Sequence, residues 1–445
     1  MKSYEKYKRL IKLLFAAVLL LMLVGIYGGA WIGYYNKMIL QAPFFRRGNW
    51  AVIALYGVLL AFFINAYGGF KVGYLKKGNL IYSQMLAVFF VNVVTYFQIS
   101  ILDKRFLSVP PMFAITVAEY VVILVWTLIF QTVYRRIFPP KKLLMIAGNR
   151  ADYHLLDKMN ARDDKYEIVE IHSFHEGLER LSEEFPRFDA VIIGDMPSHE
   201  RNLILKYCFQ ESIRTYTVPK ISDILLRSSV ELNLFDSPLM LSRNIGLTVE
   251  QQLAKRILDL VFALVAMIVS SPIFLIAGIA IKLTDGGPIF YKQTRLTQGG
   301  REFEILKFRT MIMDAEKVGG PRLASENDPR ILPIGRILRA TRMDELPQIF
   351  NILKGEMSAV GPRPERPELA AEILKEIPEF NYRLKVKAGL TGYAQVYGKY
   401  NTTFYDKLKL DLTYIRNYSF LMDLKLIFLT PKILFIKEST EGVKE

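Results

Sequence analysis

Two adjacent carboxylates, Asp344 and Glu345, are the residues whose types and spacing most directly suggest chemistry. Arg339 lies five residues before Asp344, and Arg342 lies between them. Neighbouring residues on a helix point about 100° apart, so two adjacent acids can serve one metal ion or one phosphate group from two sides. These residue types favour an acidic nucleophile or a magnesium ligand, with guanidinium groups neutralising phosphate oxygens. The alternative is an exposed helix start that carries two acids.

Further basic residues occur in the same third of the chain. Lys307 and Arg309 are two residues apart on a strand-like run, so both side chains point to one face. Pro362 and Pro364 flank Arg363 and stiffen the loop that carries its guanidinium, a group suited to bidentate phosphate recognition. The alternative for each base is contact with lipid headgroups. The candidate phosphate-binding residues are therefore Arg339, Lys307, Arg309 and Arg363, with Pro362 beside the last.

Composition indicates a membrane segment joined to a globular part. The 445 residues are 51% hydrophobic and 23% charged, and the mean hydropathy is +0.21. The formal net charge of +15 fits nucleic acid, anionic lipid or a phosphate-rich substrate. The sequence contains no nucleic-acid motif, so we expect membrane lipids and an anionic substrate as partners. The single cysteine, Cys208, excludes an intrachain disulfide and a cysteine zinc cluster.

Four apolar runs occupy the N-terminal part, at residues 13–35, 50–70, 80–102 and 111–133. Each is close to the roughly 20 residues that span a bilayer. Basic residues are more frequent at the N-terminus, between the second and third runs and after the fourth. By the positive-inside rule we predict four transmembrane helices with both ends in the cytoplasm.

Residues from about 141 to 245 have the alternation of an α/β module. Strand-like runs cover residues 142–147, 166–171 and 189–193, with helical stretches between them. A dinucleotide-binding domain would carry a glycine-rich fingerprint after the first strand, and only Gly148 is present there. We therefore predict a Rossmann-like module with a structural or regulatory role.

A long apolar run follows, in which Asp259 is the only charged residue between Arg256 and Lys282. Ser271 and Pro272 lie in its middle, where a proline removes a helix hydrogen bond and serines can satisfy the freed backbone groups. A spanning helix would place the rest of the chain outside the cell. Basic residues flank both ends, so we predict a re-entrant membrane hairpin over residues 255–283 that keeps the C-terminal part inside.

Several motifs follow one another in the C-terminal part. They are Ser271-Pro272, residues 285–290, Gln293 with Arg295, residues 306–311, Arg339 with Asp344-Glu345, residues 351–357, residues 360–364 and residues 389–395. From about residue 250 to 437 this order of motifs resembles the bacterial sugar transferase family, the monotopic polyprenol-phosphate phosphoglycosyl transferases. The four spans and the Rossmann-like module are similar to its large members, which prime exopolysaccharide, capsule or O-antigen synthesis. Tyr393 stands where many members carry tryptophan.

The resemblance implies a two-step transfer of a hexose-1-phosphate. Asp344 would attack the β-phosphate of a UDP-sugar, release UMP and form a phosphosugar intermediate, which undecaprenyl phosphate then attacks. Magnesium suits an oxygen-only site that holds phosphates, with Asp344 and Glu345 as its ligands, and which acid binds it more directly stays open. The transferred hexose and the polymer stay open as well. The expected place is the cytoplasmic face of the bacterial inner membrane.

The predicted fold is a transmembrane α-helical bundle plus α/β. The predicted domains are a four-helix transmembrane domain at 1–138, a Rossmann-like cytoplasmic module at 139–247 and a mainly α catalytic domain at 248–445. The first two are candidate surfaces for a homodimer.

Two rival functions explain less of the sequence. A membrane-anchored nucleotide-sugar dehydratase or epimerase needs a glycine fingerprint and a Tyr-x-x-x-Lys pair. Tyr405 and Lys409 match that pair, but so do Tyr4 and Lys8 at the N-terminus, and the glycines are missing. A membrane sensor with a ligand-binding Rossmann-like module leaves the paired acids and the arginines of the C-terminal part unexplained.

Overall fold

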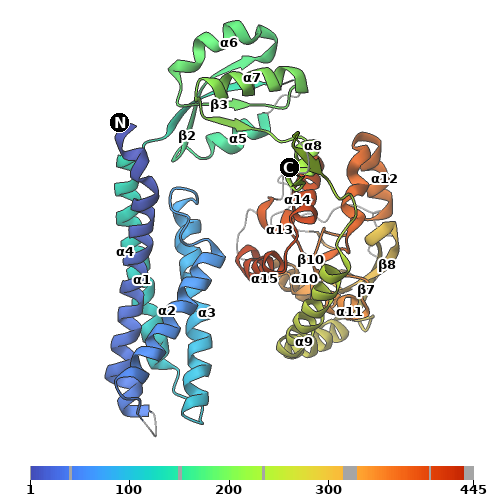
Figure 1. The fold of residues 1–445 in the computed structure, drawn as a ribbon. Helices are drawn as coiled ribbons and strands as arrows, with labels where there is room; N and C mark the ends of the chain where they lie inside the picture. The colour runs from blue at the N-terminus through green and yellow to red at the C-terminus, as the bar shows by residue number, and fades with distance from the viewer. Residues whose placement is uncertain are drawn as a thin grey trace. The chain divides into compact units, whose positions relative to one another are not determined.

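A computed structural model describes residues 2–39, 43–148, 153–232, 236–313, 328–399 and 402–434 (Figure 1). It divides the chain into two compact units, Met1–Pro219 and Lys220–Glu445. Helix α8 (Ile221–Arg227) belongs to the second unit, because Ile221 and Ile224 are buried among apolar residues of the C-terminal part. The bounds of the three domains predicted from the sequence stay a prediction.

Four long helices begin the N-terminal unit (Figure 1). They are α1 (Lys8–Ala30), which the π-helix η2 (Trp31–Ile39) continues, α2 (Arg47–Tyr67), α3 (Lys77–Leu102) and α4 (Pro110–Ile137). By length and composition each is apolar enough to cross a membrane. The predicted combination of membrane-type helices with an α/β part is therefore confirmed, while the number of spans and their orientation stay predictions.

Buried polar side chains connect three of these helices. Tyr56 of α2 donates its hydroxyl to Oε1 of Glu119 in α4, at 2.6 Å, and Asn92 of α3 donates its amide to Oε2, at 2.7 Å. Thr127 of α4 donates to Gln84 of α3 at 2.8 Å. Between apolar helices in a membrane, hydrogen bonds and close packing replace the hydrophobic effect as the source of association.

The second part of the N-terminal unit is a parallel sheet in the order β2-β1-β3-β4. Its strands are β1 (Lys141–Ala147), β2 (Tyr166–Ser173), β3 (Ala190–Ile193) and β4 (Thr215–Thr217). Helices α6 (Leu178–Glu184) and α7 (Ser198–Gln210) pack on one face, and α5 (Tyr153–Asn160) packs on the other (Figure 1). The three predicted strands are confirmed. The structure also has β4, which the sequence did not predict because this strand is only three residues long.

Gly148 follows β1 and has a packing role. A Cβ at this position would collide with the backbone of Asp195, in the loop after β3. The glycine therefore permits two loops at the carboxyl edge of the sheet to touch. Asn149 and Arg150, the next residues of the predicted turn, lie outside the described residues.

The C-terminal unit is mainly helical, and its strands occur in pairs. Two antiparallel hairpins are β5 (Val230–Leu232) with β6 (Leu239–Leu241) and β7 (Phe290–Leu296) with β8 (Glu302–Phe308). A short parallel pair joins β9 (Ser358–Val360) to β10 (Gly389–Thr391). The other elements are α9 (Val249–Asp285), α10 (Pro333–Ala340), α11 (Gln348–Lys354), α12 (Pro367–Glu376), η7 (Pro378–Lys385), α13 (Tyr393–Tyr397), α14 (Phe404–Arg416) and α15 (Phe420–Leu434).

Helix α9 is anchored by polar groups near its N-terminal end. The Lys255 ammonium is buried and donates to the Val360 carbonyl at 2.8 Å, to the Tyr414 hydroxyl at 2.9 Å and to Asp423 at 2.7 Å. One turn on, the buried Asp259 carboxylate accepts hydrogen bonds from the Ser358 hydroxyl and from the Ala359 backbone, both at 2.8 Å. These bonds tie α9 to β9 and α15. They also explain the one charge in the long apolar run.

Replacing Lys255 with methionine tests this anchor. The change leaves Asp423 buried without its cation, so we expect the free energy of unfolding to fall by about 3–5 kcal/mol. The double variant Lys255→Met/Asp423→Leu removes both charges and should recover most of that loss. Thermal unfolding of the full chain in detergent measures both. Equal losses in the single and double variants would contradict the view that the unpaired carboxylate is the cause.

Candidate active site

The paired acids lie on a turn between two helices. Helix α10 ends at Ala340, Arg342 adopts a left-handed conformation with φ of 54°, and Met343–Glu345 form a single 3₁₀ turn, η6. Arg339 and Asp344 therefore do not lie on one continuous helix. A left-handed arginine is uncommon and costs of order 1 kcal/mol or more, which the surrounding contacts must offset.

Glu345 is held in its ionised form by two cations. Lys307 donates to Oε1 at 2.9 Å and Arg363 donates to the same oxygen at 3.0 Å, while the carboxylate side chain is 14% exposed. Burial alone would raise the pKa of Glu345. The charges and hydrogen bonds of Arg363 and Lys307 outweigh burial and hold this pKa well below its usual range.

Asp344 has a different environment from its neighbour. It is half-buried, and it accepts no hydrogen bond from the residues that the structure describes. Burial and repulsion from Glu345 raise the pKa of Asp344, against the opposing effect of Lys307, Arg339 and Arg363. A raised pKa marks a more basic carboxylate, and without hydrogen bonds its lone pairs remain available to attack an electrophile.

Arg339 approaches the acids from the end of α10. Its Nε donates to the Thr310 hydroxyl at 2.9 Å, which fixes the guanidinium at the end of β8. Burial lowers the pKa of Arg339, and the charges of Asp344 and Asp328 oppose that effect. Asp328 is itself buried and binds Arg330 through Nε at 2.9 Å. Arg339 and Asp344 therefore affect each other's pKa across the turn, and their binding of one phosphate stays a prediction.

Lys307 and Arg309 do not act as a pair. Lys307 faces Glu345, whereas the buried Arg309 guanidinium forms a two-point ion pair with Asp285 and donates from Nε to the Pro288 carbonyl at 2.7 Å. Arg309 follows the last residue of β8, so strand alternation no longer aligns it with Lys307. The structure places Arg309 as a brace on the end of α9, and its phosphate-binding role stays a prediction.

Backbone contacts hold the loop that carries Arg363. Gly361 donates to the Thr391 carbonyl at 2.8 Å, and Gly389 donates to the Pro362 carbonyl at 2.9 Å. A Cβ at either glycine would collide with backbone atoms, so this close approach requires glycine. Two of the recognised motifs, residues 360–364 and 389–395, therefore lie side by side, because the backbone of each hydrogen-bonds to the backbone of the other.

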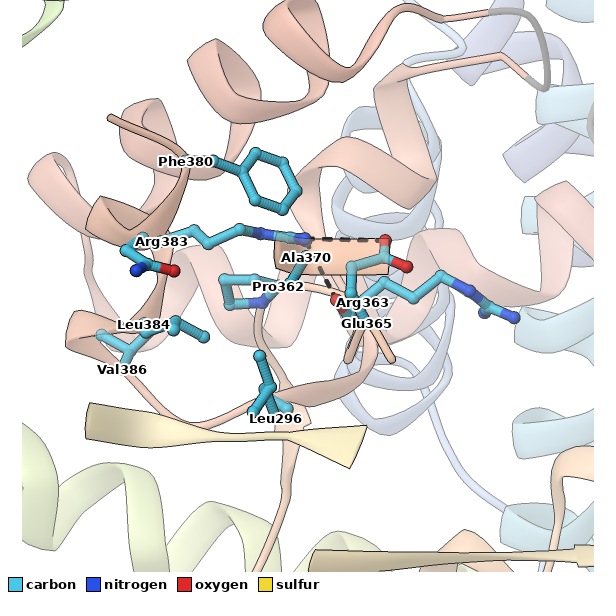
Figure 2. Close-up of a pocket in the computed structure, with 11 residues that line it drawn as sticks. Leu296, Pro362, Arg363, Glu365, Ala370, Phe380, Arg383, Leu384 and Val386 are labelled. Carbon is cyan, nitrogen blue, oxygen red and sulfur yellow. Dashed lines mark hydrogen bonds and ion pairs between the residues drawn. The ribbon is translucent and has the colours of Figure 1, made fainter. Parts of the chain in front are cut away.

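Arg383 also contacts the loop that carries Arg363. It donates to the Arg363 carbonyl at 2.9 Å and forms an ion pair with Glu365, at 3.5 Å. Figure 2 shows Arg383 and Glu365 facing each other beside a small pocket that Pro362 lines, while the Arg363 side chain extends away from it. Arg363 is 45% exposed in its side chain and keeps further donors for a ligand beyond its bond to Glu345.

Asn351 positions Lys307 through hydrogen bonds to the backbone of β8. Its buried side chain accepts from the Leu306 backbone at 3.0 Å and donates to the Glu304 carbonyl at 2.8 Å and to Glu356 at 2.7 Å. These bonds join α11, which follows the acidic turn, to β8, which carries Lys307. Sequence reasoning recognised residues 351–357 as a motif but did not assign this role to Asn351, and it missed Thr310, Asp328 and Arg383.

Ser271 and Pro272 lie inside α9, which runs as a single helix of 37 residues. Ser271 donates its hydroxyl to the Ile268 carbonyl at 2.8 Å, and Ser270 donates to the Ala266 carbonyl at 2.6 Å. The serines bond backward within the helix, and no separate loop divides it. A re-entrant path therefore requires a bend within α9, and it stays a prediction.

The fit of the site to magnesium depends on the oxygen ligands that its side chains offer. In the described part of the chain no group of three or more histidine, cysteine or acidic side chains could hold a metal. Both hydrogen bonds to Glu345 end on Oε1, which leaves Oε2 and the Asp344 carboxylate as oxygen ligands. Mg²⁺ commonly takes one or two carboxylates and completes its shell with waters and substrate phosphates, so these two acids fit an ion that a diphosphate also binds.

Comparison with known proteins finds relatives of this chain. Residues 250–437 match the model of the bacterial sugar transferase family. An Aeromonas hydrophila protein named UDP-N-acetylgalactosamine-undecaprenyl-phosphate N-acetylgalactosaminephosphotransferase is 34% identical over 258 residues, 55% of this chain and 58% of that protein. A Klebsiella pneumoniae UDP-glucose:undecaprenyl-phosphate glucose-1-phosphate transferase is also 34% identical, over 56% of this chain and 53% of its own length.

A shorter relative is matched more completely. An exopolysaccharide production protein of Sinorhizobium fredii is 37% identical over 192 residues, which are 40% of this chain and 84% of that protein. By contrast, the chain spans little more than half the length of the Aeromonas and Klebsiella relatives.

The unequal environments of the two acids predict opposite effects on stability. Glu345→Gln should lower the free energy of unfolding by about 2 kcal/mol, because two partly buried cations lose their counter-charge. Asp344→Asn should leave it unchanged or raise it by up to about 1 kcal/mol, because the substitution removes a carboxylate that burial and repulsion disfavour. Thermal unfolding in detergent at neutral pH compares them. Similar losses in both variants would contradict this division of roles.

Proposed function

The chain belongs to the bacterial sugar transferase family, and we propose that it transfers a hexose-1-phosphate from a UDP-sugar to undecaprenyl phosphate. The observation that carries the proposal is the contrast between the two acids, since Glu345 is neutralised by Lys307 and Arg363 while Asp344 is free of hydrogen bonds within the described residues. One carboxylate is thus a fixed counter-ion, and its neighbour is a nucleophile. The product primes an exopolysaccharide, capsule or O-antigen.

In the first step Asp344 attacks the β-phosphorus of the UDP-sugar. A bond forms between its carboxylate oxygen and phosphorus, the bond from phosphorus to the bridging oxygen breaks, and UMP leaves with the electron pair. In the second step an oxygen of undecaprenyl phosphate attacks the same phosphorus, and the Asp344 carboxylate departs. The two displacements let the nucleotide leave before the lipid reacts.

The cations around the turn stabilise charge on the transferred group. Phosphoryl transfer depends chiefly on positioning and on electrostatic stabilisation of the equatorial oxygens. Arg339 is fixed beside Asp344 by Thr310, and Arg363 retains donors on a loop stiffened by prolines and anchored by Arg383. Lys307 holds Glu345 in place, so Asp344 is the carboxylate left for the substrate.

Bound magnesium would neutralise charge on the diphosphate. Asp344 and Oε2 of Glu345 are the groups that would hold it, together with phosphate oxygens. A carboxylate already paired with two cations is the weaker ligand for a third, so we propose Asp344 as the principal ligand before the transfer.

The membrane positions the lipid substrate. We propose four spans in the N-terminal unit and a re-entrant α9, with the catalytic unit on the cytoplasmic face of the inner membrane. One face of α9 supports contact of this helix with the membrane, because large apolar residues on both sides of Pro272 are exposed. They are Ile268, Val269, Leu275, Ile276 and Leu283.

The sugar remains to be assigned by experiment. The Aeromonas and Klebsiella relatives are equally similar to this chain and carry names with different sugars, N-acetylgalactosamine and glucose. Overall identity therefore does not select the donor. UDP-glucose, UDP-galactose and their N-acetylated counterparts are the panel to test.

UMP release is the direct measurement of the proposed activity. We expect the wild type, in membranes with undecaprenyl phosphate and magnesium, to release UMP from one member of the panel. Asp344→Asn should lower this rate by about a thousand-fold or more, as expected when a nucleophile is removed. Glu372→Gln on α12 is the matched control, since it neutralises an exposed acid of the same unit, and it should retain the wild-type rate.

A second readout separates the intermediate from the overall reaction. Without undecaprenyl phosphate, wild type should release about one UMP per enzyme and retain the sugar phosphate on the protein. Multiple turnover without lipid would contradict a covalent intermediate. Absence of UMP from every donor, with folded protein and magnesium, would refute the transferase proposal and favour the sensor.

A further inference from the structure

A cavity of about 100 Å³ lies within the N-terminal unit, between the ends of the long helices and the edge of the sheet. Its walls come from the start of α1, the connection between α2 and α3, the end of α4, and strands β1, β2 and β4 with the residues before β2. Five cationic side chains line it. They are Lys8, Arg135, Lys141, Lys165 and Arg214.

The acids near this cavity do not balance its positive charge. Glu5 accepts from Lys141 at 2.7 Å and forms ion pairs with Arg214 at 3.2 Å and with Lys8 at 3.9 Å, so one carboxylate serves three cations. Asp164 lines the cavity but binds Arg162 at 2.7 Å. Within the described ranges, Lys165 and Arg135 have no carboxylate within ion-pair distance.

Lys165 is stabilised by aromatic rings in place of an acid. Its ammonium lies 4.6 Å from the ring centre of Tyr74 and 4.7 Å from that of Tyr166. Such contacts favour a cation, yet burial has the largest effect and lowers the pKa of Lys165, and the nearby Arg162 lowers it further, while Tyr74 and Asp164 oppose both. An anion in the cavity would supply the counter-charge that Lys165 lacks.

Gln131 gives an independent indication of a ligand. It lies on α4, lines the cavity and is only 7% exposed, and its amide Nε2 is buried without a hydrogen-bond acceptor. An unsatisfied buried donor costs about 1–3 kcal/mol. A hydrogen-bond acceptor that reaches this amide would remove the cost, whereas water would satisfy the amide without neutralising the cations.

We propose that this cavity binds a phosphate group. Lysine, arginine and amide donors converge on it, and phosphate provides several anionic oxygens for such donors. The helix ends that line the cavity are those we predict on the cytoplasmic side, at the level of lipid headgroups. The phosphate therefore belongs to a lipid headgroup or to a soluble phosphate compound. The site is separate from Asp344, so it stands whether or not the transferase proposal holds.

Binding to the purified full-length chain in a nonionic detergent tests the site with two probes. Equilibrium dialysis with radiolabelled inorganic phosphate measures the soluble source, and native mass spectrometry with short-chain phosphatidic acid measures the lipid source. Saturable binding is expected for at least one probe. Lys165→Gln and Gln131→Leu should each weaken it about tenfold, which corresponds to losing one charge-assisted hydrogen bond.

Lys142→Gln is the matched control, because Lys142 is an exposed lysine of β1 that does not line the cavity. It should change affinity by less than about twofold, as expected for a screened surface charge. Phosphate binding alone would identify a soluble ligand, and retention of phosphatidic acid alone would identify a lipid. No saturable binding of either probe, or equal losses in Lys142→Gln and Lys165→Gln, would overturn the proposal. Thermal unfolding confirms that each variant is folded.

Discussion

The unequal division of charge between Asp344 and Glu345 is the constraint on which the catalytic unit depends. Two adjacent carboxylates in a half-buried turn repel each other, and one of them must be compensated for the other to remain ionised without partners. Lys307 and Arg363 meet on a single oxygen of Glu345 and supply that compensation. These cations come from a strand and a loop that are far from the turn in sequence, so the tertiary fold decides which acid is free.

Most of the surrounding architecture fixes those two cations. Asn351 joins β8 to α11 and thereby sets the distance between Lys307 and the turn. The glycines at 361 and 389 allow two backbone segments to touch, and Arg383 holds the Arg363 carbonyl. Buried polar groups of this kind contribute little net stability compared with apolar packing, but they admit few alternative arrangements. Geometric specificity is what a phosphate site needs, because small displacements lower transfer rates strongly.

The sequence predicted the residue types of the site better than their contacts. The acidic pair, Arg339, Lys307 and Arg363 were identified from local spacing, and the structure joins Lys307 and Arg363 to Glu345, while Arg339 donates to Thr310. Arg309 was grouped with Lys307 by strand alternation, but the strand ends at Phe308 and the guanidinium pairs with Asp285. The turn at Arg342 and the role of Asn351 were not predictable, because both depend on contacts with residues distant in sequence. Periodicity identified the long helices and three strands correctly, and it missed the three-residue β4.

The positive charge of the chain has two different arrangements. Residues 250–437, which match the family, lie entirely in the C-terminal unit, where cations of the site face Asp344 and Glu345. In the N-terminal unit the cations around Gln131 outnumber the acids that line the same cavity. A fold tolerates such an excess at a cost in self-repulsion, which an anion relieves by binding the folded state more tightly than the unfolded state. A phosphate there would also join α1, α4 and the sheet, and would make the packing of bundle and sheet depend on ligand concentration.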